Sequence, residues 1–417
     1  MKRPGRKTRI AGVVGAALVI TFGFLPPVRV SVNLPRAVTI PSGQGISLPW
    51  SNWLRVKNSP MQAILVKSGV IHIRGNAPGH FVIHTKLLGW IPWRTLPVEV
   101  TRPVYEVPGG QSIGVVVKTK GLVVQGYAPV LVKGQELDPA KDAGIDPGDV
   151  IIEANHRLLT STRMLQSAVQ QSGQEHKTLA LGVEGSRRFH IRYVKPVFSQ
   201  TQKIWHLGII VQGGTTGVGT LTFYNPKTMK FAALGHSITD GLTRVPIKIT
   251  GGKLTGARIV GIIAGSMNTP GQKIGVLANG YDIEGKVKHN GIFGITGHLI
   301  HKPLQGFRRA LPVALPDQVH PGPAQIVTVL QGQKTQLFAI RILKTYVQWR
   351  PHTKGLLFQV TDPALLTRTG GIIQGMSGSP IIQNGRLVGA VTHVLLSHPS
   401  LGYGCYAYWM VKQKSFS

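Results

Sequence analysis

A chain of 417 residues is longer than one hydrophobic core usually serves, so two or three domains are expected. Its 52 Gly, 28 Pro and 42% apolar residues predict a globular, turn-rich, mainly β protein and exclude a disordered one. A net charge of +32 favours anionic partners such as phospholipid headgroups or wall polymer. Nucleic acid is not expected, because the basic residues are dispersed and carry no helix-turn-helix, zinc-finger or RNA-binding signature.

Residues 1–30 are predicted to be a basic tail and a signal anchor. The tail MKRPGRKTR holds no acid, and an uncharged run from Ile10 to Val28 follows it. About 20 apolar residues span a bilayer as a helix, with Lys and Arg on the cytoplasmic side. Since no clear A-x-A cleavage site follows, a retained anchor is favoured over a cleaved signal peptide. The remaining chain is predicted to be exported, and to stay attached by one membrane helix or to be released.

Residues 31–100 are expected to form a small β-rich leader module. Runs such as AILVKSGVIHIRG and GHFVIHTKLL read as short strands between Pro and Gly turns. No Asp or Glu precedes Glu99, and four tryptophans are interleaved with the strands: Trp50, Trp53, Trp90 and Trp93. The core of the module is predicted to bury these side chains. Contact with lipid headgroups is the alternative.

Residues 101–198 combine strand-like runs with one amphipathic helix. The segment TSTRMLQSAVQQSG predicts that helix, with Thr160 or Ser161 as its cap. The preceding run AGIDPGDVIIEAN resembles the PDZ family, whose α+β domains bind a peptide as an added strand. The resemblance implies a peptide ligand. It also implies a peptide-binding loop made of Gly110, Gln111, Ser112, Ile113 and Gly114.

Residues 199–417 alternate short apolar runs with Gly, Pro and Asn turns, which predicts a sandwich or barrel. The run GMSGSPIIQNGRLVGAV reads as a turn, a strand, a hairpin turn at Asn384-Gly385 and a second strand. Glycines at positions 375 and 378 permit positive φ angles, so the turn can direct successive N–H groups inward. Ser377 is therefore the candidate nucleophile, with the amides of Gly375 and Ser377 as the oxyanion hole.

A serine nucleophile needs a base and a group that fixes the tautomer of the base. His236 is the candidate base, because it ends an apolar strand and begins a polar loop in FAALGHSITD. Asp362 is the candidate acid, because it ends the strand LLFQVTD in a region with few carboxylates. Asp240, a water or a backbone carbonyl are the alternatives. No H-E-x-x-H run or Cys/His cluster indicates a metal, and no cofactor is expected.

The nucleophile segment is similar to that of chymotrypsin-like serine peptidases, which implies a double β-barrel. Several segments in order resemble the stage IV sporulation protein B peptidases of endospore-forming bacteria: PGGQSIGV, GVGTLTF, ALGHSITD, TDPALL and GGIIQGMSGSPIIQNG. The expected architecture is therefore mainly β: an anchor helix, the leader module, a PDZ domain, and a peptidase domain over residues 199–417.

That resemblance implies a serine endopeptidase with His236, Asp362 and Ser377 as its triad. It implies export across the forespore membrane, cleavage of the chain itself, and cleavage of a membrane-bound regulator of an intramembrane protease. The outcome would be activation of a late mother-cell sigma factor during sporulation.

Two other functions are compatible with the residues. A non-catalytic, membrane-anchored PDZ scaffold with a decayed peptidase fold would need no nucleophile. A cationic protein that binds wall polymer or nucleic acid would show binding that salt weakens. The presence of a base, an acid and a nucleophile turn in suitable contexts favours the peptidase.

Overall fold

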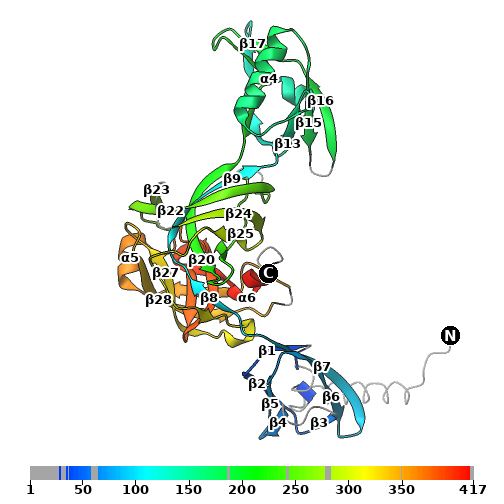
Figure 1. Ribbon diagram of the computed structural model, residues 1–417, viewed down its shortest axis with the longest axis vertical. Coiled ribbons are helices and arrows are strands. Elements are labelled where there is room, and N and C mark those ends of the chain that lie inside the picture. The colour runs from blue at the N-terminus through cyan, green and yellow to red at the C-terminus, as the bar shows by residue number, and fades with distance from the viewer. Residues whose placement is uncertain are drawn as a thin grey trace, which may run out of the picture. The chain divides into compact units, whose positions relative to one another are not determined.

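The computed structural model divides the chain into two compact units, Met1–Val104 and Tyr105–Ser417 (Figure 1). It describes residues 28–29, 34–35, 37–57, 64–185, 188–240, 244–277, 283–348 and 350–413. The predicted anchor, from Ile10 to Val28, lies outside these ranges except for its last residue. Within them, no helix is long and apolar enough to cross a membrane.

The first unit contains two sheets, with the strand orders β1-β7-β6-β3 and β2-β5-β4. The strands are β1 (Val38–Pro41), β2 (Gly45–Pro49), β3 (Leu54–Lys57), β4 (Ile64–Lys67), β5 (Val70–Arg74), β6 (Gly79–Leu87) and β7 (Ile91–Thr101). Along β6, Ile83 and Leu87 are buried while His84 is exposed, as in a strand with one face on a core. Trp50 is buried in that core, but Trp90 is 70% exposed and Trp93 is 36% exposed, so the predicted burial of all four tryptophans is wrong for Trp90 and Trp93.

The second unit begins with a barrel that closes in the order β21-β25-β24-β22-β9-β20, because β20 pairs with β21. Its strands are β9 (Ser112–Thr119), β20 (Thr215–Tyr224), β21 (Lys230–Leu234), β22 (Ile249–Ile263), β24 (Glu284–Gly291) and β25 (Gly294–Leu299). Three more strands extend the sheet: β8 (Tyr105–Pro108), β23 (Gln272–Leu277) and β26 (Leu311–Pro312). Closure pairs each strand of the ring on both sides.

An α/β subdomain lies between β9 and β20 in the chain. Its sheet has the order β16-β15-β13-β10-β19, and α4 packs on it through Leu165 and Val169. The side chain of Ser161 accepts the N–H of Met164 and caps α4, which agrees with the sequence. The elements are β10 (Leu122–Tyr127), β11 (Val130–Val132), β12 (Gln135–Leu137), α3 (Pro139–Asp142), β13 (Val150–Ala154), β14 (Arg157–Leu158), α4 (Thr162–Gln174), β15 (Leu179–Glu184), β16 (Phe189–Val194), β17 (Val197–Ser199), β18 (Ile204–His206) and β19 (Ile209–Gln212).

The predicted PDZ segment, residues 101–198, differs from this subdomain at its start. Strands β8 and β9 fall within that segment but belong to the barrel sheet, where β9 pairs with β20 on one edge and with β22 on the other. Both partner strands lie far along the chain. A local sequence pattern cannot indicate such a pairing, because the contacts that decide it are non-local.

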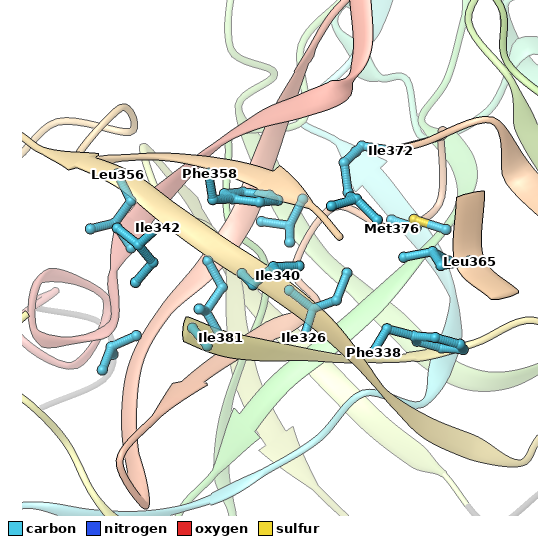
Figure 2. Packing of buried hydrophobic residues seen from close by; sticks show 14 of the residues in the cluster. Ile326, Phe338, Ile340, Ile342, Leu356, Phe358, Leu365, Ile372, Met376 and Ile381 are labelled. Atoms are coloured by element: carbon cyan, nitrogen blue, oxygen red, sulfur yellow. The ribbon is translucent and has the colours of Figure 1, made fainter. Parts of the chain in front are cut away.

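A second barrel closes in the order β27-β28-β29-β32-β31-β30. Its elements are β27 (Gly322–Val329), β28 (Thr335–Thr345), β29 (Leu356–Val360), β30 (Pro380–Gln383), β31 (Arg386–Leu395) and β32 (His398–Tyr406), with the short helices η2 (Pro316–Gln318), α5 (Pro363–Thr369) and α6 (Ala407–Val411). Figure 2 shows its core, where Ile340, Phe358 and Ile381 come from three different strands. The expected mainly β class and double β-barrel are confirmed.

The two barrels share an apolar cluster where they meet. Phe223 and Ala232 of the first barrel pack in one cluster with Leu387 and Ala390 of the second. Cys405 is fully buried in the same cluster, and burial raises the pKa of its thiol to about 12. A closely packed interior is hardly compressible, so the strand ends on the two sides of the junction are held at fixed positions relative to each other.

Candidate active site

Ser377 lies on the turn between α5 and β30. The glycines on either side, Gly375 (φ +90°) and Gly378 (φ +91°), have the positive φ angles that the sequence predicts. Between them, Met376 has no exposed surface and enters the core of the second barrel near Ile372 (Figure 2). The buried Met376 anchors the turn and leaves Ser377 only partly covered.

A β-hairpin supports the turn on its C-terminal side. Strands β30 and β31 pair antiparallel, and the residues between them, Asn384 (φ 49°) and Gly385 (φ 70°), both have left-handed backbone. Two positive φ angles in a two-residue loop are typical of a type I′ turn. The predicted strand, Asn-Gly turn and strand are therefore confirmed.

Glycine allows this turn to press against the first barrel. A Cβ on Gly378 would lie 2.4 Å from the carbonyl oxygen of Thr220 and 2.5 Å from the backbone nitrogen of Leu234. Thr220 also binds the turn directly, because its N–H donates to the Ser377 carbonyl over 3.1 Å and its hydroxyl donates to the Gly375 carbonyl over 2.8 Å. The backbone around Ser377 is therefore fixed by both barrels.

The candidate base comes from the first barrel. Strand β21 ends at Leu234 and His236 follows two residues later, as predicted. A Cβ on Gly235 would lie 2.9 Å from the carbonyl oxygen of Val391, so the chain just before His236 runs against β31. The ring centroids of His236 and His393, which lies on β31, are 5.5 Å apart.

Ser377 reaches the same junction from the second barrel. Its Oγ donates to the carbonyl of Thr392 over 3.3 Å, and Thr392 directly precedes His393. The structure thus brings two predicted catalytic residues, His236 and Ser377, to one place between the barrels. In this structure the serine hydroxyl is bonded to the backbone of β31 and not to the imidazole.

The imidazole of His236 is oriented by a backbone carbonyl. Its Nδ1 lies 2.9 Å from the carbonyl oxygen of Ser237, which assigns the ring proton to Nδ1 and leaves Nε2 as an acceptor. The Ser237 hydroxyl donates to the carbonyl of Gly291 over 2.9 Å. Burial lowers the pKa of His236 below its usual value, and the bond to Ser237 opposes part of that shift. A neutral imidazole with a free Nε2 is the form that a general base requires.

Asp362 caps a helix and does not orient the imidazole. Its Oδ1 accepts the N–H of Leu365 over 3.1 Å at the start of α5, and its Oδ2 accepts the N–H of Ala339 over 3.2 Å. Because Nδ1 of His236 is bonded to a backbone carbonyl instead, the prediction of Asp362 as the third member of a triad is wrong in this structure. A signal for its real role is present in the sequence, since Asp followed by Pro363 is a common helix start.

The alternative acid, Asp240, is buried, and its carboxylate is bonded to a residue of the α/β subdomain. Its Oδ2 accepts a hydrogen bond from Gln125 Nε2 over 2.6 Å, and its backbone N–H donates to Val245. Asp240 therefore connects the loop after His236 with β10 of the α/β subdomain. Of the three alternatives for the orienting group, the backbone carbonyl is the one that this structure contains.

The amides assigned to the oxyanion hole are not engaged by any acceptor among the residues that the structure describes. These are the N–H groups of Gly375 and Ser377. The next two amides, those of Gly378 and Ser379, donate to backbone carbonyls over 2.8 and 2.9 Å. Unengaged N–H groups on a glycine turn suit a developing negative charge. The oxyanion assignment stays a prediction.

A buried lysine supports the turn, and no sequence motif indicates it. Lys273 on β23 is 2% exposed, and its Nζ donates to Thr328 Oγ1 over 2.7 Å. A Cβ on Gly375 would lie 3.1 to 3.4 Å from three side-chain carbons of Lys273. Burial lowers the pKa of Lys273 to about 7. Its aliphatic stem therefore fills the space behind Gly375.

His393 is a second residue of the site that sequence reasoning missed. Packing around its ring, and the positive charges of His236, Lys354 and His352 when protonated, lower the pKa of His393 to about 4. Since the pKa of His236 is lowered too, both imidazoles are largely uncharged at neutral pH. His393 lies near the C-terminal end of β31, and a histidine within a strand gives no sequence signal for a site.

The predicted peptide-binding loop is part of the barrel wall. It comprises Gly110, Gln111, Ser112, Ile113 and Gly114. Ser112 is buried, and β9 already has a neighbouring strand on each edge. A strand paired on both sides cannot add a peptide, so this prediction is wrong. Among the described strands, the sheet of the α/β subdomain ends at β19, which follows Gly208 (φ +78°).

Among the residues that the structure describes, no group of three or more His, Cys, Asp or Glu side chains comes together.

Comparison with known proteins points to a peptidase family. The family model described as SpoIVB peptidase S55 matches residues 203–411. Among solved structures, the inactive form of the Rv3671c protease has 14% identity and a TM-score of 0.28, covering 46% of this chain and 79% of that chain. The active form, from M. tuberculosis, has 13% identity and a TM-score of 0.27, covering 48% and 73%. A likeness of this strength bears on neither fold nor activity. Among curated proteins nothing matches.

Proposed function

Since the chain belongs to the SpoIVB peptidase S55 family and is thus a peptidase, we propose that it is a serine endopeptidase with Ser377 as nucleophile and His236 as base. One observation carries the proposal. The glycine turn that holds Ser377 packs against the end of the strand that leads to His236. A nucleophile and a base from separate barrels are thereby held at one junction, as acyl transfer requires.

Acylation begins when the Ser377 hydroxyl rotates about its Cα–Cβ bond, away from the Thr392 carbonyl and toward Nε2 of His236. The imidazole takes the proton as Oγ forms a bond to the carbonyl carbon of the scissile peptide. The resulting oxyanion accepts the N–H groups of Gly375 and Ser377. The C–N bond then breaks, and the leaving amine takes the proton from the imidazolium. A water repeats these steps on the ester and frees the serine.

The Ser237 carbonyl performs the orienting role in this mechanism. It holds the Nδ1 proton in place, so that Nε2 always faces the reaction as the acceptor. A carbonyl dipole stabilises the imidazolium less than a carboxylate does. Burial therefore outweighs the bond to Ser237, and the pKa of His236 stays below its usual value.

We propose the same biological role that the sequence resemblance implies. The chain is exported across the forespore membrane, is anchored or released there, cleaves itself, and cleaves a membrane-bound regulator of an intramembrane protease. The family description and the N-terminal sequence pattern support this role. A peptide segment of a partner would add to the α/β subdomain at β19, one of the two edge strands of its sheet.

Replacement of the nucleophile tests the proposed chemistry, and Ser379→Ala is its matched control. Ser379 lies two residues away and is fully buried, and its hydroxyl has no hydrogen-bond partner among the described residues. Ser377→Ala should lower hydrolysis of β-casein and self-cleavage by about 10⁴ to 10⁶-fold. Ser379→Ala should retain most of the activity, and the two variants should unfold at similar temperatures.

Labelling with a fluorophosphonate separates the enzyme from the scaffold alternative. The peptidase should react with one equivalent of probe at Ser377, and Ser377→Ala should not react. A purified, folded chain that takes up no probe and cleaves neither casein nor itself would support the non-catalytic scaffold.

A further inference from the structure

The turn between β6 and β7 presents two large apolar side chains to solvent. Leu88 is 53% exposed and Trp90 is 70% exposed. Leu88 (φ 54°) and Gly89 (φ 86°) both have left-handed backbone, a conformation in which a hairpin turn favours Asn and Gly. A leucine in this conformation is strained. The tip thus exposes large apolar side chains and places a leucine at a positive φ angle. Such departures from local sequence preference are expected at functional sites.

Basic side chains cover the outer face of the sheet next to this tip. In the pairing of β3 with β6, Arg55 lies opposite Lys86, and Lys57 lies opposite His84. Like charges directly opposite each other destabilise a sheet unless an external anion compensates them. Arg55 also reaches the tip, because a Cβ on Gly89 would lie 3.8 Å from its Cγ.

The same face contains a hollow of about 540 Å³. Its lining includes three cations, Lys57, Lys86 and Arg94, and Trp93 contributes an aromatic wall. No Asp or Glu occurs before Glu99 in the whole sequence. The charge of this face is therefore complementary to a dense anionic surface.

We propose that Leu88, Gly89 and Trp90 form a membrane-inserting tip that enters the interfacial layer of an anionic phospholipid bilayer, while the adjoining basic face binds the lipid phosphates. Trp prefers the headgroup level of a bilayer, and each Lys or Arg near an anionic surface strengthens binding. A stable protein interface buries about 800 Å² on each partner. Two projecting side chains are small for that, but they are suited to a fluid surface. This proposal is independent of the peptidase activity.

Spin labelling in the full chain tests the depth of the tip. Leu88→Cys provides the reporter position, and Cys405 will not react because it is fully buried. Leu131→Cys, on β11 of the α/β subdomain and 57% exposed, is the matched control. When vesicles of phosphatidylglycerol and phosphatidylcholine are added, the label at position 88 should collide more often with oxygen and less often with a water-soluble nickel complex than it does in buffer. The label at position 131 should collide with both reagents as often as it does in buffer.

Charge and side-chain variants then test the recognition chemistry. In the Leu88→Cys background, Lys57→Gln with Lys86→Gln should lower the ratio of inserted to aqueous label by about 25-fold, at about fivefold for each cation. Trp90→Ser should lower it further. Pure phosphatidylcholine vesicles should act like the charge variants, because their headgroups carry no net charge. Salt at 1 M should do the same, because the Debye length falls to about 3 Å.

Two results would overturn the proposal. An aqueous label at position 88 in anionic vesicles would show that the tip does not insert. A label shielded equally in anionic and zwitterionic vesicles, and unaffected by the Lys variants, would show that another part of the chain covers the tip.

Discussion

The two barrels hold their catalytic residues by different means. In the second barrel, the Ser377 turn is fixed by packing: Met376 is buried in the barrel core, and Gly378 touches the backbone of the first barrel. In the first barrel, the loop that follows His236 is held by side-chain hydrogen bonds: from Ser237 to Gly291, from Gln125 to Asp240, and at Asn290. The Oδ1 of Asn290 accepts the Ile238 N–H over 2.9 Å.

The amide nitrogen of Asn290 completes this support. Its Nδ2 donates to the carbonyl of Ile238 over 2.8 Å and to the carbonyl of Ile247 over 2.9 Å. A packed turn cannot yield to an added atom, whereas water can partly replace a lost hydrogen bond. Substitutions should therefore harm the nucleophile side more than the base side.

Gly378→Ala should have the largest effect. Its Cβ would overlap the backbone of Thr220 and Leu234 and would also meet a positive φ angle. Overpacking and left-handed strain together cost about 2 to 5 kcal/mol, so kcat/KM should fall by about 30-fold or more. Gly385→Ala is the control, because it shares a positive φ angle but has no atom within 4 Å of the added Cβ. Equal losses in the two variants would show that strain alone, and not the contact between the barrels, decides activity.

Asn290→Asp should have an intermediate effect. The carboxylate still accepts the Ile238 N–H but cannot donate to the two carbonyls. Two lost hydrogen bonds cost about 1 to 3 kcal/mol, which corresponds to about a 5- to 150-fold lower kcat/KM. Fluorophosphonate labelling should slow to the same extent, while the far-UV circular dichroism stays unchanged. Unaltered kinetics would mean that the loop holds His236 without Asn290.

Asp362→Asn should have the smallest effect. Asn caps helices about as well as Asp, so α5 should lose only the acceptor for the Ala339 N–H, about 1 kcal/mol in the free energy of unfolding. Activity should stay within a few-fold of the unsubstituted enzyme. In a Ser-His-Asp triad the same change costs about 10⁴-fold in kcat. A loss of that size would restore Asp362 to the role that the sequence predicts.

The sequence was a good guide to local features of the site. The positive φ angles at Gly375 and Gly378, the Asn384-Gly385 turn and the position of His236 after β21 all depend on residues close together in the chain. Turn and hairpin chemistry is local, so a single sequence carries it.

The features that the sequence did not indicate depend on distant contacts. Lys273 meets the turn through a bridge between Gln272 and Gln374, and β9 is placed by strands far along the chain. The scarcity of acids favours Asp362 as the triad acid, whereas Asp followed by Pro363 indicates the helix start that the structure contains. A backbone carbonyl is among the sequence-based alternatives for the orienting group, but the sequence does not indicate which carbonyl, because that depends on the fold of the loop.

The pH dependence of acylation tests the central claim most directly, namely that a neutral His236 without a carboxylate partner activates Ser377. Burial lowers the pKa of His236 below 6.5, and the deprotonated ring is the base. The second-order rate of fluorophosphonate labelling should therefore rise with pH through an inflection below 6.5 and be constant at neutral pH. His236→Gln should remove this inflection and slow labelling by about 10² to 10⁴-fold. An inflection above 6.5, or one that survives in His236→Gln, would contradict the claim.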